Sequence, residues 1–262
     1  MTAPQTAPDT ASDTAPRTAL LLVGSPKPGE SSSGSLGAYL MEGLEAHGVK
    51  TQTLRVAKAV RSDEAVEELL AAAAAADLIV LSFPLYVDSL PGPAIRALEL
   101  IAARRAEGGD GGEAPAAPGA TNAQAGEAVA QAGEAQAGPA FVAICQSGFP
   151  EASHSAVAIE ICRNFASSAG LEWAGGLVMP EGGMLNGQPM SKMKGMMRSA
   201  AGALDLAAEA LAAGRPVPDE AVQRMAKLAF PRVAYRFAAN WGWRAQAKKA
   251  AGGTPLEAQP YG

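Results

Sequence analysis

The chain has 262 residues, a formal net charge of −5 and 48 % hydrophobic residues, while aromatic residues make up only 5 %. This length suits one domain with extensions or a small two-domain protein, and the apolar share allows a sizeable, mainly aliphatic core. No block of like charge occurs, so a nucleic-acid-binding protein is not expected.

The cysteines and the N-terminal residues indicate the cellular compartment in which we expect the protein. Cys145 and Cys162 are far apart and form no C-x-x-C pair, so neither a disulfide framework nor an iron–sulfur cluster is expected. The opening residues MTAPQTAPDTASDTAPR lack the basic and apolar regions of a secretory signal. No apolar run is long enough to cross a bilayer. We therefore expect a cytoplasmic protein with no integral membrane segment.

The chain then alternates between strand and helix patterns. Residues 1–17 repeat Thr-Ala-Pro and are expected to be a disordered tail. Short apolar runs predict buried strands, and leucine spacing, N-cap residues and glycine stops predict helices. In chain order, these are a strand at Thr18–Val23, a helix through Leu36, Leu40 and Leu44 ending near Gly48, a strand at Val49–Val56, a helix at Ser62–Ala76, a strand at Leu78–Phe83, a helix at Pro93–Arg105, a strand at Phe141–Cys145, a helix at Ser155–Ala169 and a strand at Trp173–Met179.

This alternation predicts a parallel sheet covered by helices on both faces. Residues 106–138 consist almost entirely of Ala, Gly, Gln, Glu and Pro, and we expect a flexible, low-complexity insertion there. The expected domain covers 18–185, and 186–262 is expected to be a helical C-terminal extension. Its predicted helices are Met190–Ala213, Asp219–Leu228 and Arg232–Lys249.

The loop GSPKPGESSSGS joins the first strand to the first helix. A helix N-terminus offers free backbone N–H groups and a positive dipole end, so this loop can bind a phosphate. The alternative is a serine-rich loop that only caps the helix. Neither the P-loop pattern nor G-x-G-x-x-G is present. Hydroxyl groups and one positive charge are available from Ser25, Ser31, Ser32, Ser33 and Lys27.

Two further loops follow strands that should be neighbours of the first. PLYVDSLPGP places Tyr86 among prolines, where its ring could stack on a flat ligand or only pack the loop down. QSGFPE carries Gly148, which allows close approach of a ligand, although it also suits an ordinary turn. Ligands of open parallel sheets bind at the carboxyl ends of the strands, where all three loops lie.

Together these motifs resemble the NADPH-dependent FMN reductase family. The resemblance rests on G-S-P-K-x-G-x-S-x-S, P-L-Y-x-x-S-L-P and S-G-F-P-E, and it covers roughly residues 18–185 apart from the insertion. It implies a flavodoxin-like three-layer α/β sandwich with a five-stranded parallel sheet in the order 2-1-3-4-5. It also implies an FMN-containing oxidoreductase that forms homodimers or homotetramers.

The resemblance also implies the roles of particular residues. The FMN phosphate would meet Ser25, Lys27, Ser31 and Ser33, with Ser32 in the same loop. The flavin ring would lie against Pro84, Leu85, Tyr86 and Val87, and Ser147, Gly148 and Phe149 would meet its other edge. Hydride would pass from NADPH or NADH to flavin N5 and on to an acceptor such as a flavin, a quinone, a nitro or azo compound or a metal ion. No catalytic side chain and no metal ligand is expected.

Other functions stay open at this point. A flavodoxin-type electron carrier would need an acidic docking face, and few acids lie in the three loops. A non-enzymatic interaction module that has lost flavin would act through the C-terminal helices. The basic and aromatic residues of 232–249 could lie on a membrane surface, but a packed helix is favoured. A Cys145–His154 nucleophilic pair is disfavoured, because cysteine inside an apolar strand is usually inert.

Overall fold

The structure is a computed structural model that describes residues 15–108, 138–193, 195, 197–227, 240–242 and 244–245. The chain divides into one compact unit up to Lys227 and a second over 228–262, and the fold below is that of the first unit. Most of the expected tail, most of the 106–138 insertion and most of the expected helix at 232–249 lie outside the described residues.

Five parallel strands form one sheet in the order β2-β1-β3-β4-β5, which confirms the fold class expected from the sequence. Each predicted strand is present to within two residues of its expected limits. The strands are β1 (Thr18–Val23), β2 (Lys50–Arg55), β3 (Leu78–Pro84), β4 (Ala140–Gln146) and β5 (Glu172–Met179).

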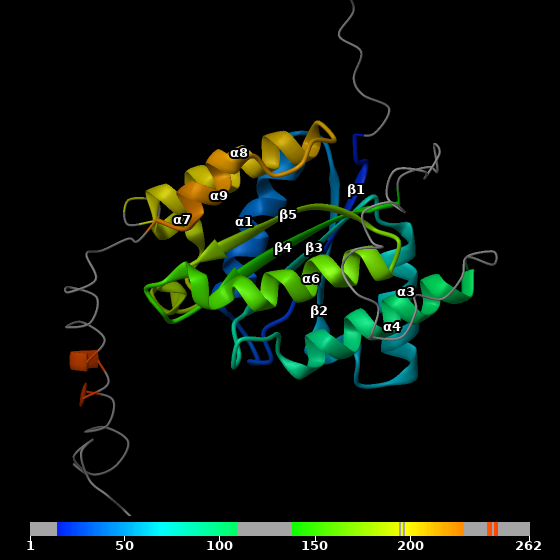
Figure 1. Cartoon of the computed structure of the whole chain (residues 1–262), viewed down its shortest axis with the longest axis horizontal. Helices are drawn as coiled ribbons and strands as arrows, with labels where there is room; N and C mark the ends of the chain where they lie inside the picture. The colour runs from blue at the N-terminus through cyan, green and yellow to red at the C-terminus, as the bar shows by residue number, and fades with distance from the viewer. Residues whose placement is uncertain are drawn as a thin grey trace, which may run out of the picture. The chain divides into compact units, whose positions relative to one another are not determined.

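Helices cover both faces of this sheet (Figure 1). One face carries α1 (Ser32–Ala46), α7 (Met190–Met193), α8 (Arg198–Ala212) and α9 (Asp219–Met225). The other carries α2 (Val56–Ala59), α3 (Asp63–Ala75), α4 (Gly92–Gly108) and α6 (Ala156–Ser168). Short 3₁₀ turns are η1 (Ala152–Ser155) and η2 (Gly182–Leu185).

The central strands are apolar along their length because they contribute side chains to both layers. Leu21 and Val23 of β1 pack on the side of α1, whereas Leu20 and Leu22 pack on the side of α3 and α4. Alternate residues of a strand point to opposite faces, so a strand buried on both faces needs no polar residue. The edge strand β2 is only partly buried, and its sequence alternates accordingly.

The two ends of α1 are fixed by local sequence. The hydroxyl of Ser31 accepts a hydrogen bond from the N–H of Gly34, with an N···O distance of 3.1 Å, and so caps the helix start. At the other end Gly48 has φ +86°, and the N–H groups of Gly48 and Val49 bond the carbonyls of Glu45 and Leu44. This is a Schellman motif, so α1 ends where the sequence predicts.

The helices after β5 share a core with α1. A Cβ on Gly43 of α1 would lie 2.7 Å from the Cβ of Ala208, so α1 and α8 approach closely there. The N–H of Val217 donates to the carbonyl of Ala174 at 2.8 Å, which covers part of the β5 edge. Residues up to Met225 therefore pack with the sheet, while the domain limits expected from the sequence stay a prediction.

The single helix expected at Met190–Ala213 is wrong. In the structure α7 ends at Met193 and α8 begins at Arg198, with Gly195 between them. Glycine is a poor helix former, and the break lets Met190 and Met197 both enter the core beside α1. The methionine and alanine pattern alone is compatible with one continuous helix, so it did not reveal the break.

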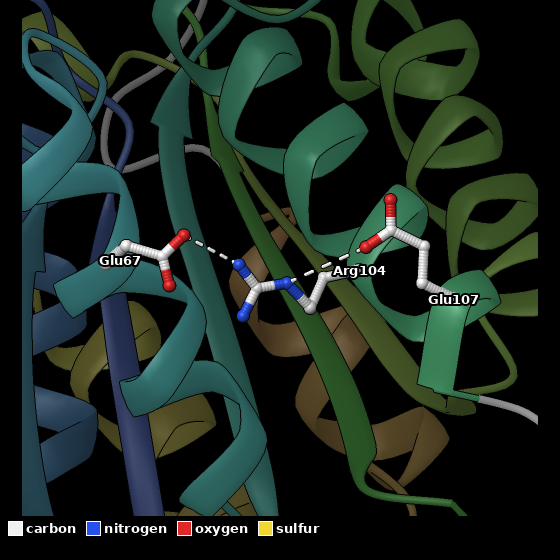
Figure 2. A network of polar contacts seen from close by, with 3 residues as sticks. All are labelled: Glu67, Arg104 and Glu107. Carbon is white, nitrogen blue, oxygen red and sulfur yellow. Dashed lines mark hydrogen bonds and ion pairs between the residues drawn. The ribbon is translucent and has the colours of Figure 1, made fainter.

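A network of exposed charges links α3 to α4 (Figure 2). The guanidinium of Arg104 lies 2.7 Å from a carboxylate oxygen of Glu67 and 4.0 Å from one of Glu107. Exposed ion pairs of this kind contribute about 0–1 kcal/mol each, so packing rather than charge holds these helices together.

Candidate functional site

The loop after β1 leaves the sheet at Gly24. The N–H of Gly24 donates to the carbonyl of Ser82 at 2.8 Å, and a Cβ at this position would lie 2.7 Å from the Cβ of Phe83. Only glycine fits between the two strands without displacing one of them. The loop thereby starts at the carboxyl ends of β1 and β3.

Two contacts hold the middle of this loop. The N–H of Lys27 donates to the hydroxyl of Ser25 at 3.4 Å. A guanidinium nitrogen of Arg55, at the end of β2, donates to the carbonyl oxygen of Lys27 at 2.5 Å. Arg55 therefore fixes the backbone that carries the single lysine of the loop.

Ser33, in the first turn of α1, is fully buried. Its carbonyl accepts a hydrogen bond from the Ser82 hydroxyl at 2.7 Å. Its own hydroxyl has no hydrogen-bond partner within the described part of the chain. A buried hydroxyl without a partner is costly, and this one belongs to the first turn of a helix, where N–H groups lack partners from the preceding turn. A bound anion would satisfy it.

The loop after β3 contains a tight reverse turn. Tyr86 and Ser89 pair as an isolated antiparallel bridge around Val87 and Asp88, which have φ values of 48° and 59°. This is the pattern of a type I′ turn, which asparagine and glycine favour. The N–H of Leu85 bonds the carbonyl of Gln146 at 2.8 Å, so this loop is attached to the end of β4.

The loop after β4 is joined in turn to the segment after β5. The N–H of Gly182 donates to the carbonyl of Ser147 at 2.8 Å, and that of Glu181 to the carbonyl of Phe149 at 3.0 Å. The ring of Phe149 contacts that of His154, with centroids 4.5 Å apart. The three predicted loops and this additional segment meet at one edge of the sheet.

A pocket of about 280 Å³ lies between them. Nine of the residues singled out from the sequence line it, namely Ser25, Lys27, Ser31, Ser32, Ser33, Pro84, Leu85, Tyr86 and Gly148. Three others do not line it. Val87 is 98 % exposed at the tip of its turn, Ser147 is buried with its hydroxyl donating to the carbonyl of Phe149, and Phe149 is packed beside His154.

Five lining residues were not among the expected site residues: Glu30, Gln146, Gly183, Asn186 and Gly187. Gln146 is the last residue of β4 and the first of the expected loop segment QSGFPE, so its place at the end of the strand could have suggested it. The last three belong to the segment after β5, which has no apolar periodicity to place it. A larger hollow, of about 520 Å³, lies at the amino ends of the strands, where open α/β sheets do not usually bind ligands.

The described residues offer no other catalytic constellation. No group of three or more His, Cys, Asp or Glu side chains in this part of the chain could hold a metal ion. Both cysteines are buried, and burial raises the pKa of the Cys145 thiol to about 12. Burial raises the pKa of the Cys162 thiol too. Thiols of this kind are poor nucleophiles. None of the helices among these residues is long and apolar enough to cross a membrane.

The sheet order defines a doubly wound α/β protein, and the pocket lies at the carboxyl edge, where such proteins bind their ligands. A family model described as NADPH-dependent FMN reductase matches residues 18–149, half of the chain, and covers the loops after β1, β3 and β4. The chain belongs to this family and is an oxidoreductase.

Similar solved structures include oxidoreductases. An NADH:FMN oxidoreductase in its apo form is 15 % identical, with 83 % of this chain and 98 % of that one covered and a TM-score of 0.49. An FMN-dependent NADH-azoreductase from Bacillus anthracis, in complex with FMN, is 14 % identical, with 74 % and 99 % covered and a TM-score of 0.48. No curated protein shows significant similarity to the chain.

Proposed function

We propose that this chain binds FMN in the pocket at the carboxyl edge and transfers hydride from NADPH or NADH to an acceptor. The observation that carries this proposal is the buried hydroxyl of Ser33, which has no partner among the described residues and belongs to a residue that lines the same pocket as Tyr86. The described residues thus fit a group that has a phosphate at one end and a flat ring at the other.

The residues after β1 would hold the phosphate. Ser25 and Lys27 of the loop, the N-cap residue Ser31 and the first-turn residues Ser32 and Ser33 of α1 all line the pocket. Hydrogen bonds from a helix N-terminus to an anion are charge-assisted and strong. Glu30 lines the same pocket, so its negative charge opposes the positive charge of Lys27. Selectivity for a phosphate would therefore depend on hydrogen-bond donors rather than on net positive charge.

The residues after β3 and β4 would hold the ring. Pro84, Leu85 and Tyr86 form one wall, and the aromatic side chain of Tyr86 is 44 % exposed and available for stacking. Gly148 also lines the pocket, and its neighbours Ser147 and Phe149 are joined by the hydrogen bond from the Ser147 hydroxyl to the Phe149 carbonyl. Val87 would act only through the turn that it forms.

Bound FMN supplies the hydride chemistry, so the protein needs no nucleophile or metal of its own. The low reactivity of the two buried thiols is consistent with a protein that supplies no nucleophile. The acceptor belongs to the broad set of flavins, quinones, nitro or azo compounds and metal ions. The two free, buried cysteines support a reducing compartment, and we propose the cytoplasm.

We also propose that the chain forms a homodimer or homotetramer. Five exposed large apolar side chains lie in the loops and first helical turns that follow β3 and β4, namely Tyr86, Val87, Ile95, Phe149 and Val157. Such a concentration is typical of an interaction surface. Light scattering during size-exclusion chromatography measures the mass directly, and a monomeric mass near 26.5 kDa would contradict this proposal.

The test of the function is the visible spectrum of the purified protein with FMN added, before and after anaerobic NADPH and NADH. Flavin bands that stay with the protein and bleach with either nicotinamide are the expected result. Bands that bleach only with a chemical reductant would instead indicate an electron carrier. Absence of bound flavin after FMN addition would contradict the proposal as a whole.

A further inference from the structure

The segment after β5 contacts two walls of the pocket that are far from it in sequence. At one end, a Cβ on Gly187 would lie 3.0 Å from the Cβ of Glu30 and 3.1 and 3.2 Å from its carbonyl carbon and oxygen. At the other end, a Cβ on Gly182 would collide with the side chain of Gln146. The segment therefore runs from the loop after β4 to the loop after β1.

Its path is fixed at both ends. Backbone hydrogen bonds from Glu181 and Gly182 attach it to the loop after β4, as described above. Leu185 is fully buried in the core beside α1, and Met190 follows it there. A segment anchored in this way keeps its position without a ligand, so it can form a preorganised wall of the pocket.

The backbone between these anchors is unusual. Asn186 has φ 43° and Gly187 has φ 77°, so two successive residues occupy the left-handed region. Asparagine and glycine are the residues that tolerate this conformation best. Gly183, Asn186 and Gly187 all line the pocket, and the contacts with Glu30 and Gln146 place this segment between the loop after β1 and the loop after β4.

We propose that residues 181–187 form a fourth cofactor-binding loop, in which the Asn186 side chain binds the ribityl part of FMN. An amide offers both donors and an acceptor, which suits a chain of hydroxyl groups. Gly187 permits this by letting the loop approach Glu30 to contact distance. This inference rests on the proposed function, because it assumes that FMN occupies this pocket.

The test compares FMN dissociation constants, measured by quenching of FMN fluorescence on titration with the full-length apoprotein. Asn186→Gly removes the amide and keeps the backbone free to adopt positive φ. The loss of one hydrogen bond should raise Kd about fivefold. Gly187→Ala forces the turn away from Glu30 and should raise Kd about tenfold or more.

Gly48→Ala is the matched control for Gly187→Ala. Gly48 also has positive φ, but a Cβ there would meet nothing within 4 Å, and it lies at the far end of α1. The control should lose thermal stability and keep the wild-type Kd. If Gly187→Ala does not fold, the Asn186→Gly titration decides alone.

The outcomes separate the two proposals. Wild-type protein that binds FMN, with variants at 186 and 187 that bind it equally well, would overturn the fourth loop and leave the function intact. Wild-type protein that takes up no FMN would overturn both. Weaker binding by Asn186→Gly, with an unchanged melting temperature of the apoprotein, would establish the loop as part of the cofactor site.

Discussion

Tyr86 and Ser89 exchange two backbone hydrogen bonds, with N···O distances of 2.9 and 3.0 Å, and so close a two-residue turn. The first residue inside that turn is Val87, whose φ is 48° and whose side chain is almost fully exposed. A β-branched residue is strained in this conformation, and its side chain gains nothing from packing. Strain of this kind tends to persist where a site requires it.

We therefore predict that Val87→Asn stabilises the protein. Asparagine tolerates positive φ, so relief of the strain should raise the free energy of unfolding by about 1 kcal/mol. Urea denaturation of the apoprotein measures this. Val157→Asn is the control, because Val157 is also exposed but lies in the regular helix α6. A gain from both variants, or from neither, would contradict the strain assigned to the turn.

Ser31 and Ser33 should respond differently to the loss of their hydroxyls. The Ser31 hydroxyl caps α1, so Ser31→Ala should lower the free energy of unfolding of the apoprotein by about 1 kcal/mol. The Ser33 hydroxyl makes no hydrogen bond to the described chain, so Ser33→Ala should not lower stability. It should weaken FMN binding by about 1–3 kcal/mol, if that hydroxyl bonds the phosphate.

Paired urea denaturation and FMN titrations distinguish these effects, with Ser168→Ala as an exposed serine control on α6. A clear loss of apoprotein stability in Ser33→Ala would mean that its hydroxyl has a structural partner. Unchanged FMN affinity in that variant would remove Ser33 from the cofactor site.

Much of this fold could be predicted from the sequence because the three central strands are buried on both faces. TALLLV, LIVLSF and FVAIC are short continuous apolar runs, which in an α/β protein are typical of strands buried on both faces. Each of them precedes a loop of the pocket. The sheet order came from the family resemblance, since the spacing of strands along the chain does not determine which strands pair.

The segment around Asn186 could not be predicted in the same way. Its place in the pocket depends on Leu185 entering the core beside α1 and on the fit of Gly187 against Glu30. Neither contact leaves a periodic pattern in the sequence. Gln146 was missed for a simpler reason, because the pattern S-G-F-P-E on which the resemblance rests begins one residue after it.

Arg55 should contribute to FMN binding without contacting the cofactor's phosphate directly. Its guanidinium holds the carbonyl of Lys27, so Arg55→Ala should loosen the loop after β1 and raise the Kd for FMN about fivefold. Lys50→Ala is the control, because it removes the same charge from the opposite end of β2, where Lys50 pairs with Thr18. An equal weakening in both variants would indicate a general charge effect.

Asp77 links the start of β1 to the start of β3. Its carboxylate accepts hydrogen bonds from the N–H groups of Arg17 and Thr18 and from the Thr18 hydroxyl, each at 2.9 Å. Burial acts to raise the pKa of Asp77, but these hydrogen bonds and the charge of Arg17 outweigh it and lower the pKa below its ordinary value. A lowered pKa means that the folded protein favours the ionised form.

Asp77→Asn should therefore destabilise the protein at neutral pH, by about 1 kcal/mol because the site is largely exposed. Since the pKa of Asp77 is lower in the folded than in the unfolded chain, its contribution is present above about pH 4 and disappears as pH falls through the folded value. Urea denaturation of wild type and variant at pH 7 and at pH 3 measures the difference. A difference that stays constant between these pH values would show that the ionised carboxylate is not what stabilises the start of the sheet.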